Sequence, residues 1–281
     1  MLNKTGNVQT YLGCTAGYDE ADIVIFGAGY DGTTSNRPGS RFAPAAMRTE
    51  SFGLETYSPY LQRDLEDIKV YDAGDLELYG RRPEVMLTLI EETVAEIAKD
   101  GKIPVMIGGE HLVTLGAVRA LAKAHPDLHI IHLDAHADLR ADYLGEELSH
   151  ATVMRRCYDL VGDGRIFQVG IRSGTREEFE FKAAHIAQTL ENFMDKPIYF
   201  TLDLDVLDPA ALPGTGTPEA GGMTFLELLN DIVHLEKFNI IGCDIVELSP
   251  PYDPSGISTA TACKILRELM LVMSPIPSFR A

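Results

Sequence analysis

Three short segments of the chain place carboxylates and imidazoles at or just after the ends of apolar runs. They read GGEH at 108–111, DAHAD at 134–138 and DLD at 203–205. Burying such groups is costly unless another group pairs with them or a metal ion binds them. The six side chains able to bind a metal are His111, Asp134, His136, Asp138, Asp203 and Asp205.

The number and type of these side chains predict a pair of metal ions. Residues two apart on an extended segment share a face, so Asp203 and Asp205 can converge on one cation or bracket two. Four carboxylates and two imidazoles exceed what a single divalent ion usually takes, and a carboxylate can bridge two ions. Ligands rich in carboxylate and free of thiolate favour Mn²⁺, although Co²⁺, Ni²⁺ or Zn²⁺ could occupy the site in vitro. Two such ions can activate a bridging water, which predicts metal-assisted hydrolysis.

Each segment alone also has a structural interpretation. Asp134 and His136 could form a turn at a strand end, and Asp203 with Asp205 could cap the loop before Pro209. Three such endings after separate apolar runs are much harder to explain as turns, so their combination favours the metal site.

The elements that must position these groups alternate along the chain. Strands are expected at 22–26, 68–71, 103–107, 128–133, 165–169, 198–202 and 240–246. Helices are expected at 43–55, 83–99, 112–125, 151–160, 176–187, 224–235 and 259–273. Nearly continuous apolar strands indicate a parallel sheet that is buried on both faces. Ligands of such sheets bind beyond the carboxyl ends of the strands, where the six side chains are predicted to lie.

No linker, shift in composition or internal repeat divides the sequence. We therefore predict a single α/β domain over residues 1–281, with three α/β/α layers and a mostly parallel central sheet.

A glycine pattern near the N-terminus suggests a different function. Gly27-x-Gly29-x-x-Gly32 follows a predicted strand, as in dinucleotide-binding proteins. That fingerprint needs a helix opening at the glycines and an acidic residue at the end of the next strand. Here Pro38 and Gly39 interrupt any helix, and Glu50 falls in a helical pattern. We therefore expect a long loop that could line the mouth of an active site.

Composition narrows the classes of partner. The formal charge of −18 argues against nucleic acid and anionic membranes, which are bound through Lys and Arg. It is compatible with metal cations and a cationic substrate, and equally with solubility alone. The four scattered cysteines are expected to be reduced. The absence of a membrane-length apolar segment or a secretory signal favours a cytoplasmic location.

The motifs together resemble the ureohydrolase family, which includes arginases and agmatinases. The resemblance covers nearly the whole chain and rests on GGEH (108–111), DAHAD (134–138), TLDLDVLDPAALPGTGTPEAGG (201–222) and GCDIVELSPPYDPSG (242–256). It implies an arginase-like fold, two Mn²⁺ ions per subunit and a homo-oligomer, either a trimer or a hexamer.

The resemblance also implies roles for individual residues. One metal would be held by His111, Asp134, Asp138 and Asp203, and the other by Asp134, His136, Asp203 and Asp205, with Asp134 and Asp203 bridging. Glu247 would bind the substrate guanidinium and His150 would transfer protons. A metal-bridging hydroxide, oriented by Asp138, would attack the guanidinium carbon and release urea and an amine. Without the resemblance, a loop histidine is more often surface structure, and a strand-end glutamate often pairs with an arginine.

The identity of the guanidino substrate depends on two positions. Arginases carry Asn and Ser where this chain has Arg140 and Glu146. VELSPPYDPSG and PGTGTPEAGG look like the agmatinase branch, which implies hydrolysis of agmatine to putrescine, a step of polyamine biosynthesis. Guanidinobutyrase, arginase or formiminoglutamase activity and a non-catalytic regulatory relative are the alternatives. Arg140 could pair with Glu146 or Asp142, or select a carboxylate at the far end of the substrate.

Overall fold

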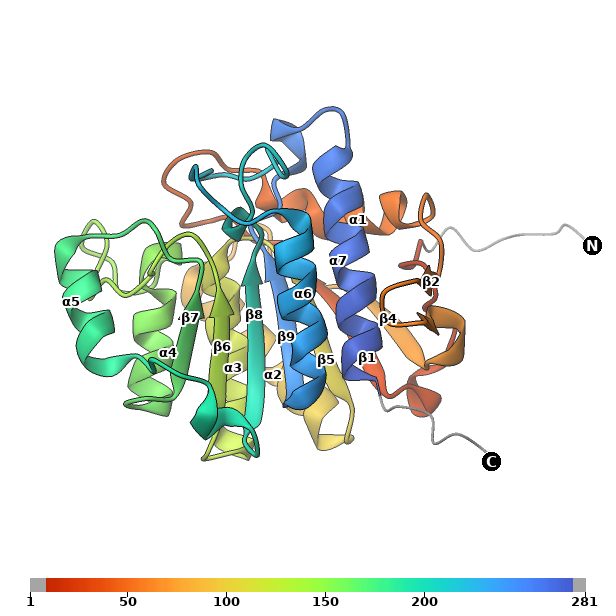
Figure 1. The fold of residues 1–281 in the computed structure, drawn as a ribbon, viewed down its shortest axis with the longest axis horizontal. Helices are drawn as coiled ribbons and strands as arrows, with labels where there is room; N and C mark the ends of the chain where they lie inside the picture. Colours follow the sequence, from red (N-terminus) through yellow and green to blue (C-terminus); the bar gives the residue numbers. More distant parts are fainter. Residues whose placement is uncertain (1–8, 275–281) are drawn as a thin grey trace, which may run out of the picture.

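A seven-stranded sheet forms the centre of the molecule (Figure 1). The computed structural model describes residues 9–274, so the predicted domain extends beyond them at both ends. The strand order is β4-β1-β5-β9-β8-β6-β7, and every pairing is parallel. The strands are β1 (Ile23–Ala28), β4 (Val70–Asp75), β5 (Ile103–Gly108), β6 (His129–Leu133), β7 (Ile166–Val169), β8 (Pro197–Asp203) and β9 (Asn239–Val246). The predicted parallel α/β fold is confirmed.

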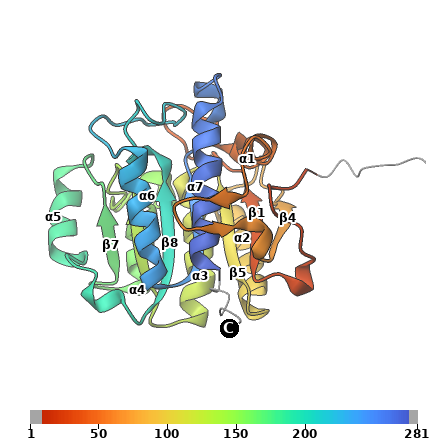
Figure 2. The same cartoon turned by 45° about the vertical axis from the view of Figure 1, so that its right-hand side comes forward.

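Helices cover both faces of this sheet (Figures 1 and 2). Their bounds are α1 (Ala43–Ser51), α2 (Pro83–Lys99), α3 (Thr114–Ala124), α4 (Val153–Val161), α5 (Arg176–His185), α6 (Phe225–His234) and α7 (Ile257–Met273). One apolar core joins α1, α6 and α7 to the sheet. A second joins α2, α3 and α4 to it. Burial from both sides explains why all five residues of β6 are buried.

Several boundaries differ from the prediction. The helix expected at 43–55 ends at Ser51, and a two-stranded hairpin of β2 (Tyr57–Ser58) and β3 (Arg63–Asp64) was not expected. Strand β4 runs on to Asp75 although its second half is polar. Buried Arg48 lies 2.8 Å from Asp72 and also contacts Asp75, so ion pairs compensate polar groups that do not match an apolar strand pattern.

The order of the strands gathers the polar segments at one edge. Strands β5, β9, β8 and β6 are consecutive neighbours in the sheet although β6 directly follows β5 among the sheet strands in the chain. Their carboxyl ends lead into GGEH, Glu247, Asp203 and the DAHAD segment. Parallel strands present these ends on one side, so four segments distant in sequence meet there.

The glycine-rich segment after β1 is a loop. No α-helix opens between Ala28 and the 3₁₀ turn Ser40–Phe42, and Glu50 lies in α1, so the dinucleotide interpretation is excluded as expected. Close approach to the sheet edge explains one glycine, since a Cβ at Gly109 would lie 1.8 Å from the Tyr30 carbonyl oxygen. The loop is thereby pressed against the GGEH segment.

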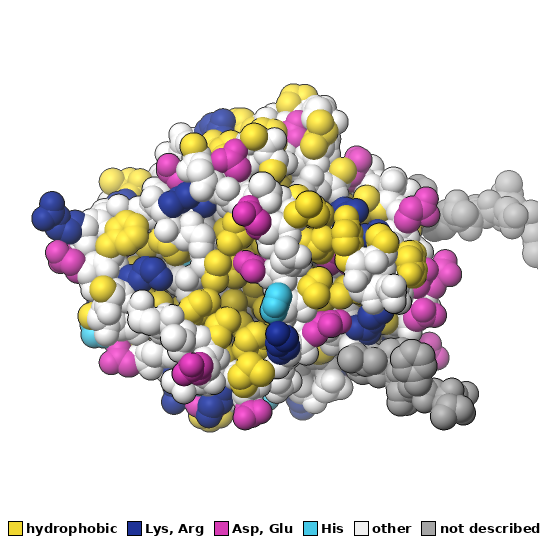
Figure 3. Space-filling model, in the orientation of Figure 1, with side chains coloured by type: hydrophobic (Ala, Val, Ile, Leu, Met, Phe, Trp, Pro, Cys, Tyr) yellow, Lys and Arg dark blue, Asp and Glu magenta, His cyan; other side chains and the backbone are white. Residues whose placement is uncertain are grey.

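The surface adds two observations. Hydrophobic side chains gather between α5 and α6 (Figure 3), where an apolar groove is lined by Leu133, Phe167, Val169, Leu190, Phe200 and Phe238. Within residues 9–274, no helix has the length and hydropathy needed to cross a membrane.

All four cysteines are unpaired, as expected.

Candidate active site

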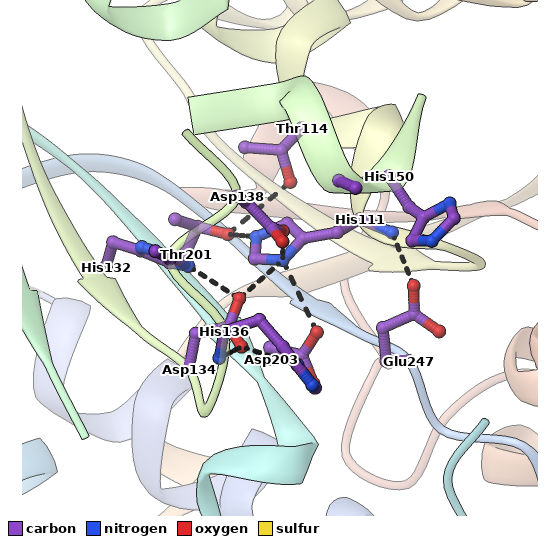
Figure 4. Close-up of polar contacts among 12 residues, drawn as sticks. His111, Thr114, His132, Asp134, His136, Asp138, His150, Thr201, Asp203 and Glu247 are labelled. Carbon is purple, nitrogen blue, oxygen red and sulfur yellow. Dashed lines mark hydrogen bonds and ion pairs between the residues drawn. The ribbon is translucent and has the colours of Figure 1, made fainter. Parts of the chain in front are cut away.

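The six predicted metal ligands lie in one cluster beyond the carboxyl ends of β5, β6 and β8 (Figure 4). His111 opens a 3₁₀ turn after β5, and Asp134 follows β6 directly. Asp203 ends β8, and Asp205 lies in the next 3₁₀ turn. A cleft lies above these six residues, and we call them the floor of this cleft.

His111 presents an unpaired nitrogen to this cluster. Its Nδ1 lies 3.0 Å from Asp134 Oδ2, 3.3 Å from Asp203 Oδ2 and 3.4 Å from Asp138 Oδ2. This buried atom has no hydrogen-bond partner among the described residues. A buried imidazole nitrogen facing three carboxylates fits a divalent cation shared between them.

The hydrogen bond behind His111 selects the tautomer of its neutral ring. Its Nε2 lies 3.0 Å from the Thr201 hydroxyl, which itself donates to Asp244 Oδ1 at 2.6 Å. Since Thr201 has one proton to give, its oxygen must accept from Nε2–H. The ring is therefore held in the tautomer that leaves Nδ1 free for a metal.

A second ligand group lies beside the first. His136 Nδ1 is 2.9 Å from Asp205 Oδ2 and 3.5 Å from Asp134 Oδ1, and the ligand atoms of all three residues lie within 4.8 Å of one another. Asp134 thus faces both histidines with different oxygens. This arrangement fits two cations that share Asp134.

The carboxylates of the floor are costly without cations. Burial, followed by the charges of Asp205 and Asp134, raises the pKa of Asp203 well above its usual range. Burial and the charge of Asp134 raise the pKa of Asp138 to about 7. A hard divalent ion supplies the positive charge that this donor set lacks.

His132 was missed by the sequence interpretation. Its Nε2 lies 2.8 Å from Asp134 Oδ2, and the Gln168 side-chain amide donates to its Nδ1 at 3.0 Å and to the Ala137 carbonyl at 2.8 Å. Nε2–H therefore donates to Asp134, and burial lowers the pKa of His132 to about 4, keeping the ring neutral. Because both nitrogens are engaged, His132 is placed to orient Asp134 rather than to bind a metal itself. Its position two residues before Asp134, on the same face of the strand, was the available signal.

Two functional candidates sit in unusual backbone conformations. Asp138 has φ +52° and Glu247 has φ +63°, in the left-handed region that non-glycine residues seldom adopt. Glu247 Oε1 accepts a hydrogen bond from the His111 backbone N–H at 2.9 Å. Such strain, in the loop after β6 and directly after β9, is typical of functional positions.

His150 reaches the cleft through the glycine-rich loop. Its Nδ1 lies 3.1 Å from the Thr33 carbonyl oxygen, and its backbone N–H donates to Thr33 Oγ1 at 3.1 Å. Thr33 is anchored in turn by Glu110, whose carboxylate accepts from the Thr33 amide and hydroxyl and from the Thr34 hydroxyl. Glu110 is fully buried and was not singled out from the sequence, although it lies in GGEH.

The cleft above the floor has a volume of about 380 Å³. The floor residues other than Asp134 line it with His150 and Glu247, and four loop residues form what we call the rim: Ser35, Arg140, Tyr143 and Glu219. The glycine-rich loop therefore does line the mouth, through Ser35 and Asn36.

Arg140 pairs with neither acidic residue considered from the sequence. Its Nε lies 3.4 Å from Glu178 Oε2, and its guanidinium lies over the Tyr143 ring at 4.9 Å from the centroid. Glu146 is exposed on the turn next to the rim, and its backbone forms an isolated antiparallel β-bridge with Tyr143. Glu178 lies 38 positions along the chain from Arg140 and also caps α5, which local sequence does not reveal.

Comparisons with known proteins agree with this architecture. Residues 21–272 match the model of the Arginase family. Agmatinase from Bacillus subtilis is 45% identical over 277 residues, covering 94% of this chain and 96% of the relative. A crystal structure from Clostridium difficile superposes with a TM-score of 0.88 and 51% identity, covering 92% of this chain and 99% of that chain. Guanidinobutyrase from Pseudomonas aeruginosa is 32% identical, covering 90% or more of this chain and 87% of the relative.

Proposed function

Since the chain belongs to the arginase family and is a ureohydrolase that cleaves C–N bonds, we propose that it hydrolyses agmatine to putrescine and urea. The observation that carries the proposal is the unpaired His111 Nδ1 among three carboxylates, directly below a cleft that also contains Glu247 and His150. The expected similarity to agmatinases supports the choice of substrate.

The floor would hold two divalent cations, which we propose to be Mn²⁺. His111, Asp134, Asp138 and Asp203 would hold one, and Asp134, His136, Asp203 and Asp205 the other. When bound, the pair would lower the pKa of a water toward neutrality and stabilise the negative charge on the attacking oxygen.

Glu247 supplies the carboxylate for the guanidinium. Its Oε1 is engaged by the His111 amide, and Oε2 lies near Gly216 at the cleft. Burial and the neighbouring charge of Glu110 raise the pKa of Glu247 to about 8. A guanidinium bound beside it favours the charged carboxylate and forms directed hydrogen bonds, which orients the carbon above the floor.

In this proposal His150 transfers a proton and Asp138 orients the attacking oxygen. His150 donates Nδ1–H to the Thr33 carbonyl, so Nε2, which lies 3.3 Å from the Ser35 hydroxyl, is its basic atom, and burial lowers the pKa of the ring. A neutral ring can accept a proton at Nε2 and pass it to the leaving amine. Asp138 presents its carboxylate on the same floor, where it would orient the attacking oxygen as well as hold metal.

The environment of Arg140 supports a substrate without a distal carboxylate. Its guanidinium is already paired with Glu178, so an incoming carboxylate would compete with that contact. The second candidate is hydrolysis of 4-guanidinobutyrate, favoured because Arg140 lines the cleft with 37% of its side chain exposed.

A substrate panel tests the proposal. Protein reconstituted with Mn²⁺ is assayed for urea or formamide release from agmatine, arginine, 4-guanidinobutyrate and formiminoglutamate, and bound metal is counted in the same samples. We expect agmatine to give the highest kcat/KM. No product from any substrate despite two bound metals would overturn the enzymatic proposal.

Three further parts of the proposal concern the whole chain. We propose that residues 1–281 form one domain, that the protein is cytoplasmic, and that it assembles as a homo-oligomer. Light scattering coupled to size-exclusion chromatography measures the last of these directly, and a monomer at micromolar concentration would contradict it.

A further inference from the structure

The carboxylates that line the cleft differ in whether they already have partners. Asp138, Asp203 and Asp205 face floor histidines, and Glu247 accepts from the His111 amide. Glu178 accepts from the Leu139 and Thr175 amides and pairs with Arg140. Glu219 also lines the cleft, yet its carboxylate has no hydrogen-bond or ion-pair partner within residues 9–274. Among the described residues of the cleft, the Glu219 carboxylate is therefore the one that is available to a ligand.

The loop that presents Glu219 is held at both ends. The Arg172 guanidinium donates to the backbone carbonyl oxygens of Glu219 at 2.7 Å and Ala220 at 3.2 Å. The same guanidinium donates to the carbonyl of Asp205 at 2.7 Å, which ties the loop to the floor. Upstream, Asn36 and Arg37 both donate to the Gly216 carbonyl. The backbone of this loop is therefore positioned independently of the Glu219 side chain.

Chain connectivity limits the distance between Glu219 and Glu247, which line the same cleft. A Cβ at Gly216 would lie 3.8 Å from Glu247 Oε2, and Glu219 follows three residues later. Three residues span at most about 11 Å. Four methylenes between a guanidino nitrogen and an amine span roughly 6 Å when extended, so one molecule can reach from Glu247 toward Glu219.

From this arrangement we infer that Glu219 binds the distal ammonium of the substrate and selects a guanidino compound with a cationic tail. The inference rests on the proposed agmatine hydrolysis and assigns the second end of that substrate. Opposite charges attract strongly in a cleft partly screened from water, and the ammonium can donate three hydrogen bonds. Arg140 also lines the cleft, but its ion pair with Glu178 weakens its repulsion of the substrate ammonium.

Glu219→Gln tests the inference, since it keeps the shape of the side chain and removes its charge. With metal-loaded protein, kcat/KM for agmatine should fall about 10-fold or more, mainly through KM. 1-Butylguanidine, which lacks the distal amine, should be turned over equally by wild type and variant. Glu219→Asp should recover part of the loss. Glu92→Gln, which removes an exposed charge on α2 outside the cleft, should leave agmatine turnover unchanged.

Calorimetric titration with agmatine separates this inference from the proposed function. If wild type binds agmatine but releases no urea, the proposed function fails while a weaker affinity in Glu219→Gln still supports the inference. If wild type is active and Glu219→Gln has an unchanged KM, the inference is wrong. An equal loss for agmatine and 1-butylguanidine also overturns it, because the residue would then be structural. Wild-type protein that does not bind agmatine overturns both.

Discussion

On the floor of the cleft, all six side chains come from strand ends or the turns just after them, and five of the six are buried. On the rim, Ser35, Arg140, Tyr143 and Glu219 come from loops and are partly or largely exposed. Floor groups have further partners behind them, such as Thr201 behind His111 and His132 behind Asp134. The Glu219 carboxylate has none within the described chain.

In the proposed function, this difference separates the reaction, on the floor, from the choice of substrate, on the rim. Metal ligands must be held within narrow limits of distance and direction, and a buried strand end with hydrogen-bonded support provides that. A rim built from loops can change residue types without disturbing the sheet. We therefore expect substitutions on the floor to abolish chemistry, and substitutions on the rim to change which substrate is used.

The largest effect is expected for Asp134→Asn. Asp134 faces both His111 and His136, so loss of its charge should remove bound metal and reduce urea release to background. Metal content by mass spectrometry and the urea assay measure the two losses together. Asp195→Asn, at an exposed carboxylate that does not line the cleft, is the control. Normal turnover in the Asp134→Asn variant would show that Asp134 does not bind the metals.

Thr201→Val tests the support beneath the floor. The variant keeps the shape of the side chain but leaves His111 Nε2–H and Asp244 without their shared hydroxyl. Metal affinity should fall about 10-fold to 100-fold, measured by competition with a chelator. The exposed Thr88→Val on α2 should match wild type. Unchanged affinity would mean that the His111 tautomer is set elsewhere.

Glu110→Gln tests the connection between floor and rim. An amide cannot accept all the hydrogen bonds from Thr33 and Thr34, and one unsatisfied buried group costs about 1–3 kcal/mol. We expect kcat to fall because Thr33 positions His150, while both metals stay bound. The urea assay measures kcat, thermal unfolding measures the loss of stability, and metal analysis counts the bound ions. Loss of metal together with kcat would place Glu110 among the supports of the floor instead.

The smallest effect is expected for Arg140→Met. Its partner Glu178 is buried, but the Arg140 side chain is 37% exposed, and pairs screened by solvent contribute about 0–1 kcal/mol. Agmatine turnover should therefore stay within about five-fold of wild type. Steady-state kinetics decide the point, and a much larger loss would show that Arg140 contacts the substrate.

Individual residues show how far sequence patterns reach. The apolar run at 130–133 predicted that Asp134 and His136 follow a buried strand, because such a run is a local pattern. His132 has the same spacing, but its role depends on Gln168 in the neighbouring strand β7. The loop at 29–39 was recognised from Pro38 and its glycines, whereas its attachment to Glu110 and its support of His150 required the fold.

By itself, the sequence determined the ligand types, their order and the strand ends that present them, since these follow from composition and short-range periodicity. Only the tertiary structure decided which nitrogen of each histidine faces the floor, which acid pairs with Arg140, and which carboxylate of the cleft remains free. The physical reason is the strand order: long-range packing places β5, β9, β8 and β6 side by side, and no local pattern encodes that neighbourhood.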